Sequence, residues 1–249
     1  GGYVYIANGK LNITAANDGI QAETVLRCEN GEIDIISGGG SSQKLSDSES
    51  SFKGLKAGSD IQITGGSITV DSLDDAVHSN NTVTVDNGTL TLSTGDDGIH
   101  ADKDLSVSGG KITVSKSYEG LEGSRVLISG GEISITASDD GINSAGGSDS
   151  QNPGMGFKAD SFSGSQYELV ISGGYVVVNA SGDGLDSNGS ITVSGGVTLV
   201  SGPTSNGDGA LDCDGTATVS GGVVVALGSS GMAQGFGSAE NQGAILCGF

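Results

Sequence analysis

The chain has 249 residues, with 30 acidic side chains against 10 lysines and arginines and a formal net charge of −20. This balance excludes a protein that follows nucleic-acid phosphates, because such binding requires a basic surface, and it favours cations as partners. No run of about 18 apolar residues is present, so we expect no insertion into a membrane.

The first predicted element is a strand at Tyr3-Val4-Tyr5-Ile6. The chain begins within this strand and shows no signal peptide, so we interpret it as a mature or trimmed chain. The three cysteines have no close pair and therefore do not form a disulfide framework.

A repeated sequence follows and continues almost to the C-terminus. It combines D-D-G-I-x-A with x-x-L-x-I-S-G-G-x-I-x-I, and clear copies begin at Gly95, Ser117 and Gly182. One small residue marks the same point in all copies: Gly19, Gly54, Ala76, Gly98, Gly120, Gly141, Gly184 and Ala210. The central steps between these positions are 22, 22, 22 and 21 residues, which is a solenoid period.

Two steps are longer, at 35 and 43 residues, and the additional residues fall near 38–50 and 146–165. We interpret both as loops on one face of a single domain that spans residues 1–249. A ninth, incomplete copy begins near Gly231.

Each copy has the alternation of two short strands around a turn. Leu105-Ser106-Val107 is followed by Ser108-Gly109-Gly110 and then by Lys111-Ile112-Thr113-Val114. This pattern predicts an all-β protein, a parallel β-helix of about eight or nine turns of ~22 residues, with neighbouring strands ~4.8 Å apart. Aligned copies place Cys28 and Cys213 in columns of inward-facing residues, where we expect both to be core residues.

Carboxylates gather at one point of the repeat, so successive turns would place them above one another. Two such charges ~5 Å apart repel by about 1 kcal/mol in water and by roughly 3 kcal/mol at an effective dielectric of 20. Oxygen ligands of this kind select Ca²⁺. The predicted calcium ligands are Asp74, Asp75, Asp96, Asp97, Glu119, Glu122, Asp139, Asp140, Asp183, Asp186, Asp208 and Asp212. The alternative is that Asp-Asp-Gly forms a turn before a permissive glycine.

Other side chains of this corner are candidates for ligand contact: Lys53, Lys56, His78, His100, Tyr118 and Lys158. His78 and His100 would stack on adjacent turns, either as a metal-binding pair or, as is more common, as a solvated row. Lys53 and Lys56 would lie one turn from Asp75 and could serve as a base or relieve acid repulsion. Aromatic residues gather loosely in the middle third: Tyr118, Phe157, Phe162, Tyr167 and Tyr175.

The "DDGI…ISGG" repeats and the acidic corner resemble a family of clostridial cell-surface carbohydrate-binding proteins, over residues 17–227. The resemblance implies a right-handed β-helix similar to pectate lyases, calcium bound between turns, and a location outside the cell or on its surface. It also implies binding of cellulose and of acidic sugars such as polygalacturonate.

Three functions remain open from the sequence. The favoured one is a monomeric polysaccharide-binding protein without catalytic residues. A calcium-dependent lyase would need a Lys or Arg base beside the metal, and Lys53, Lys56, Lys103, Arg125 and Lys158 are candidates. A structural or adhesive stalk is the third.

Overall fold

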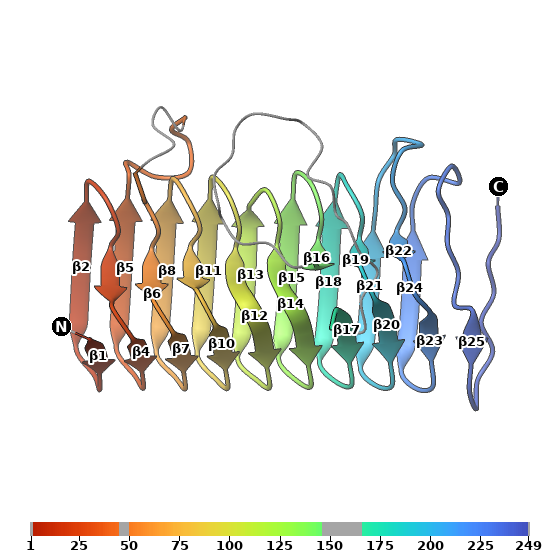
Figure 1. Ribbon diagram of the computed structural model, residues 1–249, viewed down its shortest axis with the longest axis horizontal. Coiled ribbons are helices and arrows are strands. Elements are labelled where there is room, and N and C mark those ends of the chain that lie inside the picture. The colour runs from red at the N-terminus through yellow and green to blue at the C-terminus, as the bar shows by residue number, and fades with distance from the viewer. Residues whose placement is uncertain (1, 45–49, 146–165, 249) are drawn as a thin grey trace.

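The chain folds as a parallel β-solenoid of about ten turns, and the described residues contain strands but no helix. The structure is a computed structural model that describes residues 2–44, 50–145 and 166–248. The turns lie side by side along the long axis, with the N-terminal and C-terminal turns at opposite ends (Figure 1). Within the described residues, no helix has the length and apolarity that a membrane crossing requires.

Each complete turn contains three strand positions. The first strands form one parallel ladder: β1 (Tyr3–Ile6), β4 (Val25–Cys28), β7 (Asp60–Ile63), β10 (Thr82–Val85), β12 (Ile99–Val107), β14 (Leu121–Ile128), β17 (Glu168–Ile171), β20 (Ser190–Val193), β23 (Ala217–Val219) and β25 (Ser238–Ala239).

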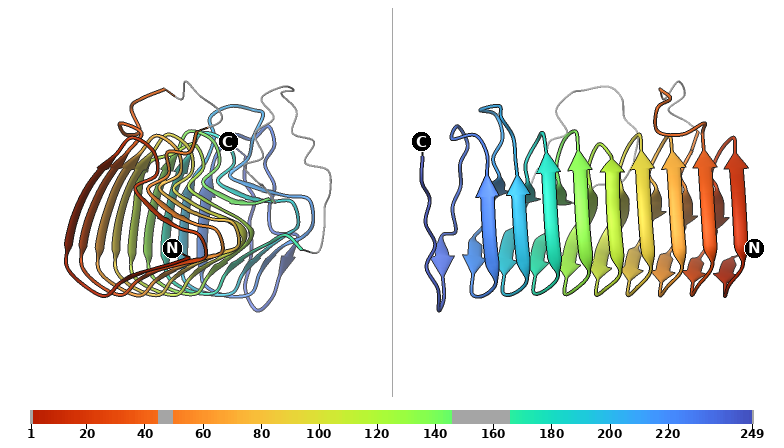
Figure 2. Two further views of the ribbon diagram at one scale, coloured as in Figure 1. Left: turned by 60° about the vertical axis from the view of Figure 1, so that its left-hand side comes forward. Right: turned by 180° about the vertical axis from the view of Figure 1, so that it is seen from behind.

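The second strands form a separate nine-stranded parallel sheet, which we call sheet B (Figure 2). Its strands are β2 (Lys10–Ala15), β5 (Glu32–Ser37), β8 (Ser67–Ser72), β11 (Thr89–Thr94), β13 (Lys111–Lys116), β15 (Glu132–Ala137), β18 (Tyr175–Ala180), β21 (Val197–Ser201) and β24 (Val223–Leu227).

The third strands are short and join the first ladder through β12 and β14, which extend through both positions. They are β3 (Ile20–Ala22), β6 (Leu55–Ala57), β9 (Val77–Ser79), β16 (Ile142–Ser144), β19 (Leu185–Ser187) and β22 (Leu211–Cys213), together with the starts of β12 and β14.

Alternating side chains explain the core. In β10 the residues Val83 and Val85 are fully buried while Thr82 and Thr84 face outward, and the pattern repeats in the neighbouring strands. Burial of each such valine, leucine or isoleucine contributes about 1.5–3 kcal/mol relative to exposure. Cys28 is a buried core residue as expected, whereas Cys213 is only half-buried near the end of the solenoid.

Two kinds of glycine position shape the turns. The second glycine of each S-G-G segment has left-handed backbone, such as Gly110 with φ +83° and Gly196 with φ +76°. The small repeat position does not have a positive φ. At Gly141 a Cβ atom would instead collide with the Val178 side chain and the backbone of Gly184 in the next turn, so close packing of turns requires a small residue there.

The solenoid has more turns than the eight or nine expected. The repeat count followed the acidic motif, which closes the first eight turns. The last two turns, with β23, β24 and β25, lack this motif and a third strand within the described residues.

Candidate functional site

The acidic corner is the bend that joins each strand of sheet B to the short third strand after it. One row of this corner, which we call the capping row, precedes the small repeat position and contains Asp18, Lys53, Asp75, Asp97, Glu119, Asp140 and Asp183. Backbone hydrogen bonds connect this row from turn to turn, for example from Gly98 N to Glu119 O and from Gly120 N to Asp140 O, both 3.0 Å. The structure therefore brings these side chains together along one edge.

Carboxylates of the capping row also hold the backbone of the next turn. Asp75 Oδ1 accepts a hydrogen bond from Asp97 N at 3.0 Å, and Asp97 Oδ1 accepts one from Glu119 N at 3.2 Å. Asp140 Oδ1 accepts one from Asp183 N at 2.6 Å. These carboxylates therefore hold successive turns together. The turn with a left-handed glycine, which was the alternative from the sequence, is not present at these positions, because the glycine or alanine after each of them has no positive φ.

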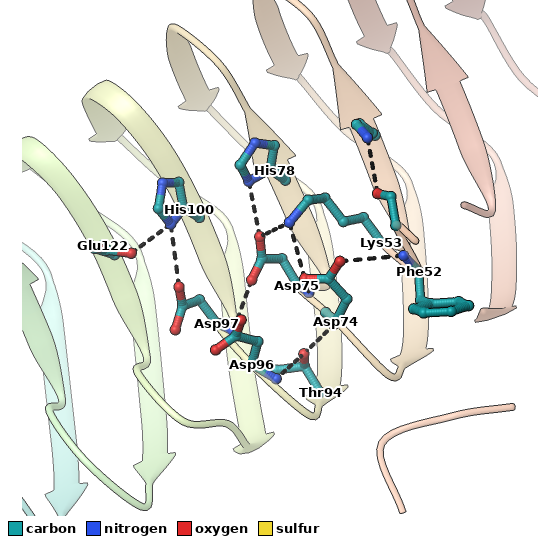
Figure 3. Close-up of polar contacts among 12 residues, drawn as sticks. Phe52, Lys53, Asp74, Asp75, His78, Thr94, Asp96, Asp97, His100 and Glu122 are labelled. Carbon is teal, nitrogen blue, oxygen red and sulfur yellow. Dashed lines mark hydrogen bonds and ion pairs between the residues drawn. The ribbon is translucent and has the colours of Figure 1, made fainter. Parts of the chain in front are cut away.

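Lysines neutralise the N-terminal part of the corner. Lys53 Nζ lies 2.6 Å from Asp75 Oδ2 and 3.0 Å from Asp74 Oδ1, and Asp75 is fully buried (Figure 3). Lys56 Nζ lies 3.3 Å from Asp18 Oδ2. Burial alone would raise the pKa of Asp75, but the charge of Lys53 and the hydrogen bond with His78 outweigh it and lower that pKa.

A second row of the corner, the strand row, lies on the third strands in exact register: Gln21, Lys56, His78, His100, Glu122, Asn143, Asp186 and Asp212. His78 and His100 stack in it as expected, but the expected solvated row is wrong, because only 3% of His78 and 1% of His100 are exposed. Neighbours on both sides at strand spacing exclude water from side chains in the middle of this row.

Carboxylates surround His100. Its Nδ1 lies 2.5 Å from Glu122 Oε2 and 3.2 Å from Asp97 Oδ2, and its Nε2 lies 3.3 Å from Asp102 Oδ1 without hydrogen-bond alignment (Figure 3 shows the first two contacts). Burial by itself would lower the pKa of His100, but Asp102, Asp97 and Glu122 raise it well above the ordinary value. We therefore interpret His100 as a buried cation.

The C-terminal part of the corner, which we call the acidic end, has no such partner. It comprises Asp140, Asp183, Asp186, Asp208 and Asp212, and no lysine, arginine or histidine in residues 2–44, 50–145 and 166–248 forms an ion pair with them. Lys158 is the one lysine or arginine that follows Arg125 in the sequence, against 12 aspartates and glutamates. Carboxylate oxygens of Asp183, Asp186 and Asp212 lie within 4.8 Å of one another.

Burial and mutual repulsion raise the pKa of these carboxyl groups. The pKa is about 7 for Asp140, about 6 for Asp183 and about 8 for Asp186, with burial as the largest cause and neighbouring aspartates adding to it. A group of oxygen donors without a cation fits Ca²⁺. At the N-terminal part, Lys53 and His100 already fill this role, so the donors there do not fit calcium equally well.

The remaining predicted residues have different surroundings. Glu119 Oε2 accepts a hydrogen bond from Asn143 Nδ2 at 3.0 Å, and Asn143 Oδ1 is buried without a hydrogen-bond partner in the described part of the chain. Tyr118 is 48% exposed and its hydroxyl interacts with Asp139, which raises the pKa of Tyr118. Asp96 lies at the exposed edge, close to Asp74 and Asp75. Lys158, with Phe157 and Phe162, lies outside the described residues.

The other aromatic residues of the middle third do not form one cluster. Tyr175 begins β18 whereas Tyr118 follows the end of β13, so they lie at opposite ends of the parallel strands of sheet B. Two further residues, Asn80 and Asp102, flank the histidines and were not predicted from the repeat pattern. Asn80 Oδ1 lies 3.0 Å from His78 Nε2, and Asp102 Oδ1 lies 3.3 Å from His100 Nε2. Each follows its histidine by two residues, and the two-residue period of a strand would have placed them on the same face.

Comparison with protein families adds a chemical class to this geometry. A family model described as "Carbohydrate-binding domain-containing protein" matches residues 1–98 and, in a second match, residues 96–159. Together the matches cover well over half of the 249 residues. No curated protein and no solved structure matches the chain.

Proposed function

Because the chain belongs to the family of carbohydrate-binding domain-containing proteins, we propose that it is an extracellular protein that binds plant cell-wall polysaccharides and holds calcium at its acidic end. The observation that carries the calcium part is the contrast within one corner. The N-terminal carboxylates have Lys53 and His100, whereas Asp183, Asp186 and Asp212 converge without a basic partner in the described structure.

The proposed ion would be shared between turns. Asp183 and Asp186 come from the turn of β19, and Asp212 comes from the next turn on β22. Calcium takes six to eight oxygen ligands, about half of which three aspartates can supply. Asp208 and Asp140 are further candidates, because the charge of Asp208 raises the pKa of Asp183 and the charge of Asp140 raises the pKa of Asp186. Calcium bound there would link successive turns and present an open coordination position to a uronate carboxylate.

The polymer part of the proposal rests on family membership and on shape. A stack of parallel strands gives long, flat faces, which suit extended chains. Cellulose and polygalacturonate are the proposed polymers, the second through calcium. We expect the protein to act as a monomer.

A calcium-dependent lyase is the alternative, and the contacts of Lys53, one of its candidate bases, argue against that role for this side chain. A general base must release its proton at working pH, yet the Lys53 ammonium contacts two carboxylates that stabilise its charged form.

The test is affinity electrophoresis on neutral and acidic polysaccharides, with calcium or with a chelator, together with elemental analysis for bound calcium. We expect retardation in at least one polymer, and retardation in polygalacturonate that the chelator removes. Lack of binding to every polymer contradicts the polysaccharide proposal. Absorbance of unsaturated uronate products would support the lyase instead. A protein that contains no calcium, and whose melting temperature does not change when calcium is added, would contradict the metal site.

A further inference from the structure

Two tyrosines lie side by side on the outer face of the first strand. In β1 the residues Val4 and Ile6 face the core, and Tyr3 and Tyr5 face outward with 55% and 49% exposure. Their ring centroids are 6.4 Å apart, with 30° between the ring planes. Two neighbouring aromatic rings that remain this exposed contribute little to the core, and exposed apolar surface of this kind is typical of binding sites.

One carboxylate positions the second tyrosine of this pair. The Tyr5 hydroxyl donates a hydrogen bond of 2.6 Å to Glu29 Oε2, and Arg27 Nη2 donates one of 2.7 Å to Glu29 Oε1. Arg27 is also the register partner of Tyr5 on the adjacent strand β4. These hydrogen bonds orient the Tyr5 ring before any ligand arrives, which lowers the entropic cost of binding.

We propose that Tyr3, Tyr5, Arg27 and Glu29 form a stacking platform for the pyranose rings of a neutral polysaccharide, an inference that rests on the proposed polysaccharide binding. The C–H faces of a sugar ring would pack on the tyrosines, and its hydroxyl groups would meet the guanidinium and carboxylate at the edge. All four residues lie within residues 1–98, which the family model matches.

Charge selects the neutral polymer. Arg27 and Glu29 cancel each other, so the platform offers no free cation for a uronate. Where no calcium is bound, the net charge of −20 repels acidic polymers and a second copy of the chain alike. A neutral glucan meets no such repulsion.

The surface beside the platform allows an extended chain. In the first ladder the Tyr5 position is followed by Arg27, Gln62 and Thr84 on successive strands, and the Tyr3 position by Val25, Asp60 and Thr82. These outward side chains give a flat face with hydrogen-bonding groups at each strand. The platform is at the N-terminal end of the solenoid, far along its axis from the acidic end, so binding there should not require calcium (Figure 1).

The test uses the full chain and three variants on insoluble cellulose and on a soluble neutral β-glucan, in chelator. Tyr3→Ala/Tyr5→Ala should weaken binding about tenfold, a change of about 1.4 kcal/mol, because it removes both rings on which the sugar would pack. Tyr3→Phe/Tyr5→Phe keeps both rings and should retain most of the binding. Tyr175→Ala removes an equally exposed tyrosine, 46%, from sheet B and should have no effect.

Thermal melting confirms that the variants fold. Unchanged binding by the double alanine variant, or an equal loss in Tyr175→Ala, overturns the platform. A wild-type protein that binds only polygalacturonate in calcium also overturns the platform while leaving the proposed function in place. A protein that binds no polysaccharide refutes the proposed function itself.

Discussion

His78 stacks on His100 with ring centroids 4.9 Å apart and 28° between the planes, and Nδ1 of each ring faces the aspartate three residues before it. The pair lies inside a row of acids and is almost inaccessible to water. Together with Lys53, His100 supplies internal positive charge where the repeat sequence would otherwise place only carboxylates.

Replacement of His100 by glutamine should destabilise the fold by about 3 kcal/mol, because it leaves Asp97, Glu122 and Asp102 without their cation in a buried position. Chemical denaturation measures the change. Lys111→Gln is the control, since Lys111 pairs with Glu132 at the surface and should cost less than about 1 kcal/mol. Equal effects of the two substitutions would show that His100 is not a buried counter-ion.

In chelator, the free energy of unfolding should fall as the pH rises from about 4 to 8. The raised pKa values of Asp140, Asp183 and Asp186, about 7, 6 and 8, mean that the folded state holds more protons than the unfolded state in this range. The raised pKa of His100 acts in the same direction above about pH 6.5, because the stability that its proton provides is lost as the pH rises.

Denaturation curves at pH 5 and pH 8 test this slope. Saturating calcium should flatten or reverse it, since the metal requires ionised carboxylates. The lowered pKa of Asp75 acts in the opposite direction, but only in more acidic solution. Stability that increases toward pH 8 in chelator would contradict the prediction.

Asp186→Asn should have opposite effects with and without calcium. In chelator at pH 8 it relieves repulsion with Asp140, Asp183 and Asp212 and should stabilise the protein by about 1 kcal/mol. In calcium it removes a metal ligand, so the increase in melting temperature on addition of calcium should be much smaller for the variant than for the wild type. Asp34→Asn removes the same charge from the outer face of β5 and should change neither value. A variant that responds to calcium as the wild type does would place the metal elsewhere.

Gly110→Ala should destabilise the fold by about 1–3 kcal/mol, because φ is +83° and the new Cβ would lie 2.8 Å from Gly88 O. Gly207 has open space around its Cβ position and no positive φ, so Gly207→Ala is the matched control and should be nearly neutral. Melting temperatures of the two variants give the comparison, and similar values would argue against strain at the S-G-G turn.

The repeat sequence was sufficient to predict the solenoid, because the two-residue alternation and the 22-residue period each determine which side chains meet. The same reasoning placed Asp75, Asp97 and Asp140 along one edge. It could not show that Lys53 lies between Asp74 and Asp75, since a flexible four-carbon side chain can reach several partners. The burial of His78 and His100 could not be predicted either. Their side chains point away from the core, as the pattern indicates, but neighbouring side chains of the corner cover them. The calcium ligands stay a prediction.

The capping row has a further consequence for how such a molecule changes length. In several turns an aspartate side chain accepts from the amide of the equivalent residue one turn later, so each of these turns offers the acceptor that the next one needs. Excision or duplication of one whole repeat between two such turns would join an acceptor to a matching donor and leave no buried amide unpaired. The protein is therefore built so that its length can vary by whole units while the edge that carries the charges stays continuous.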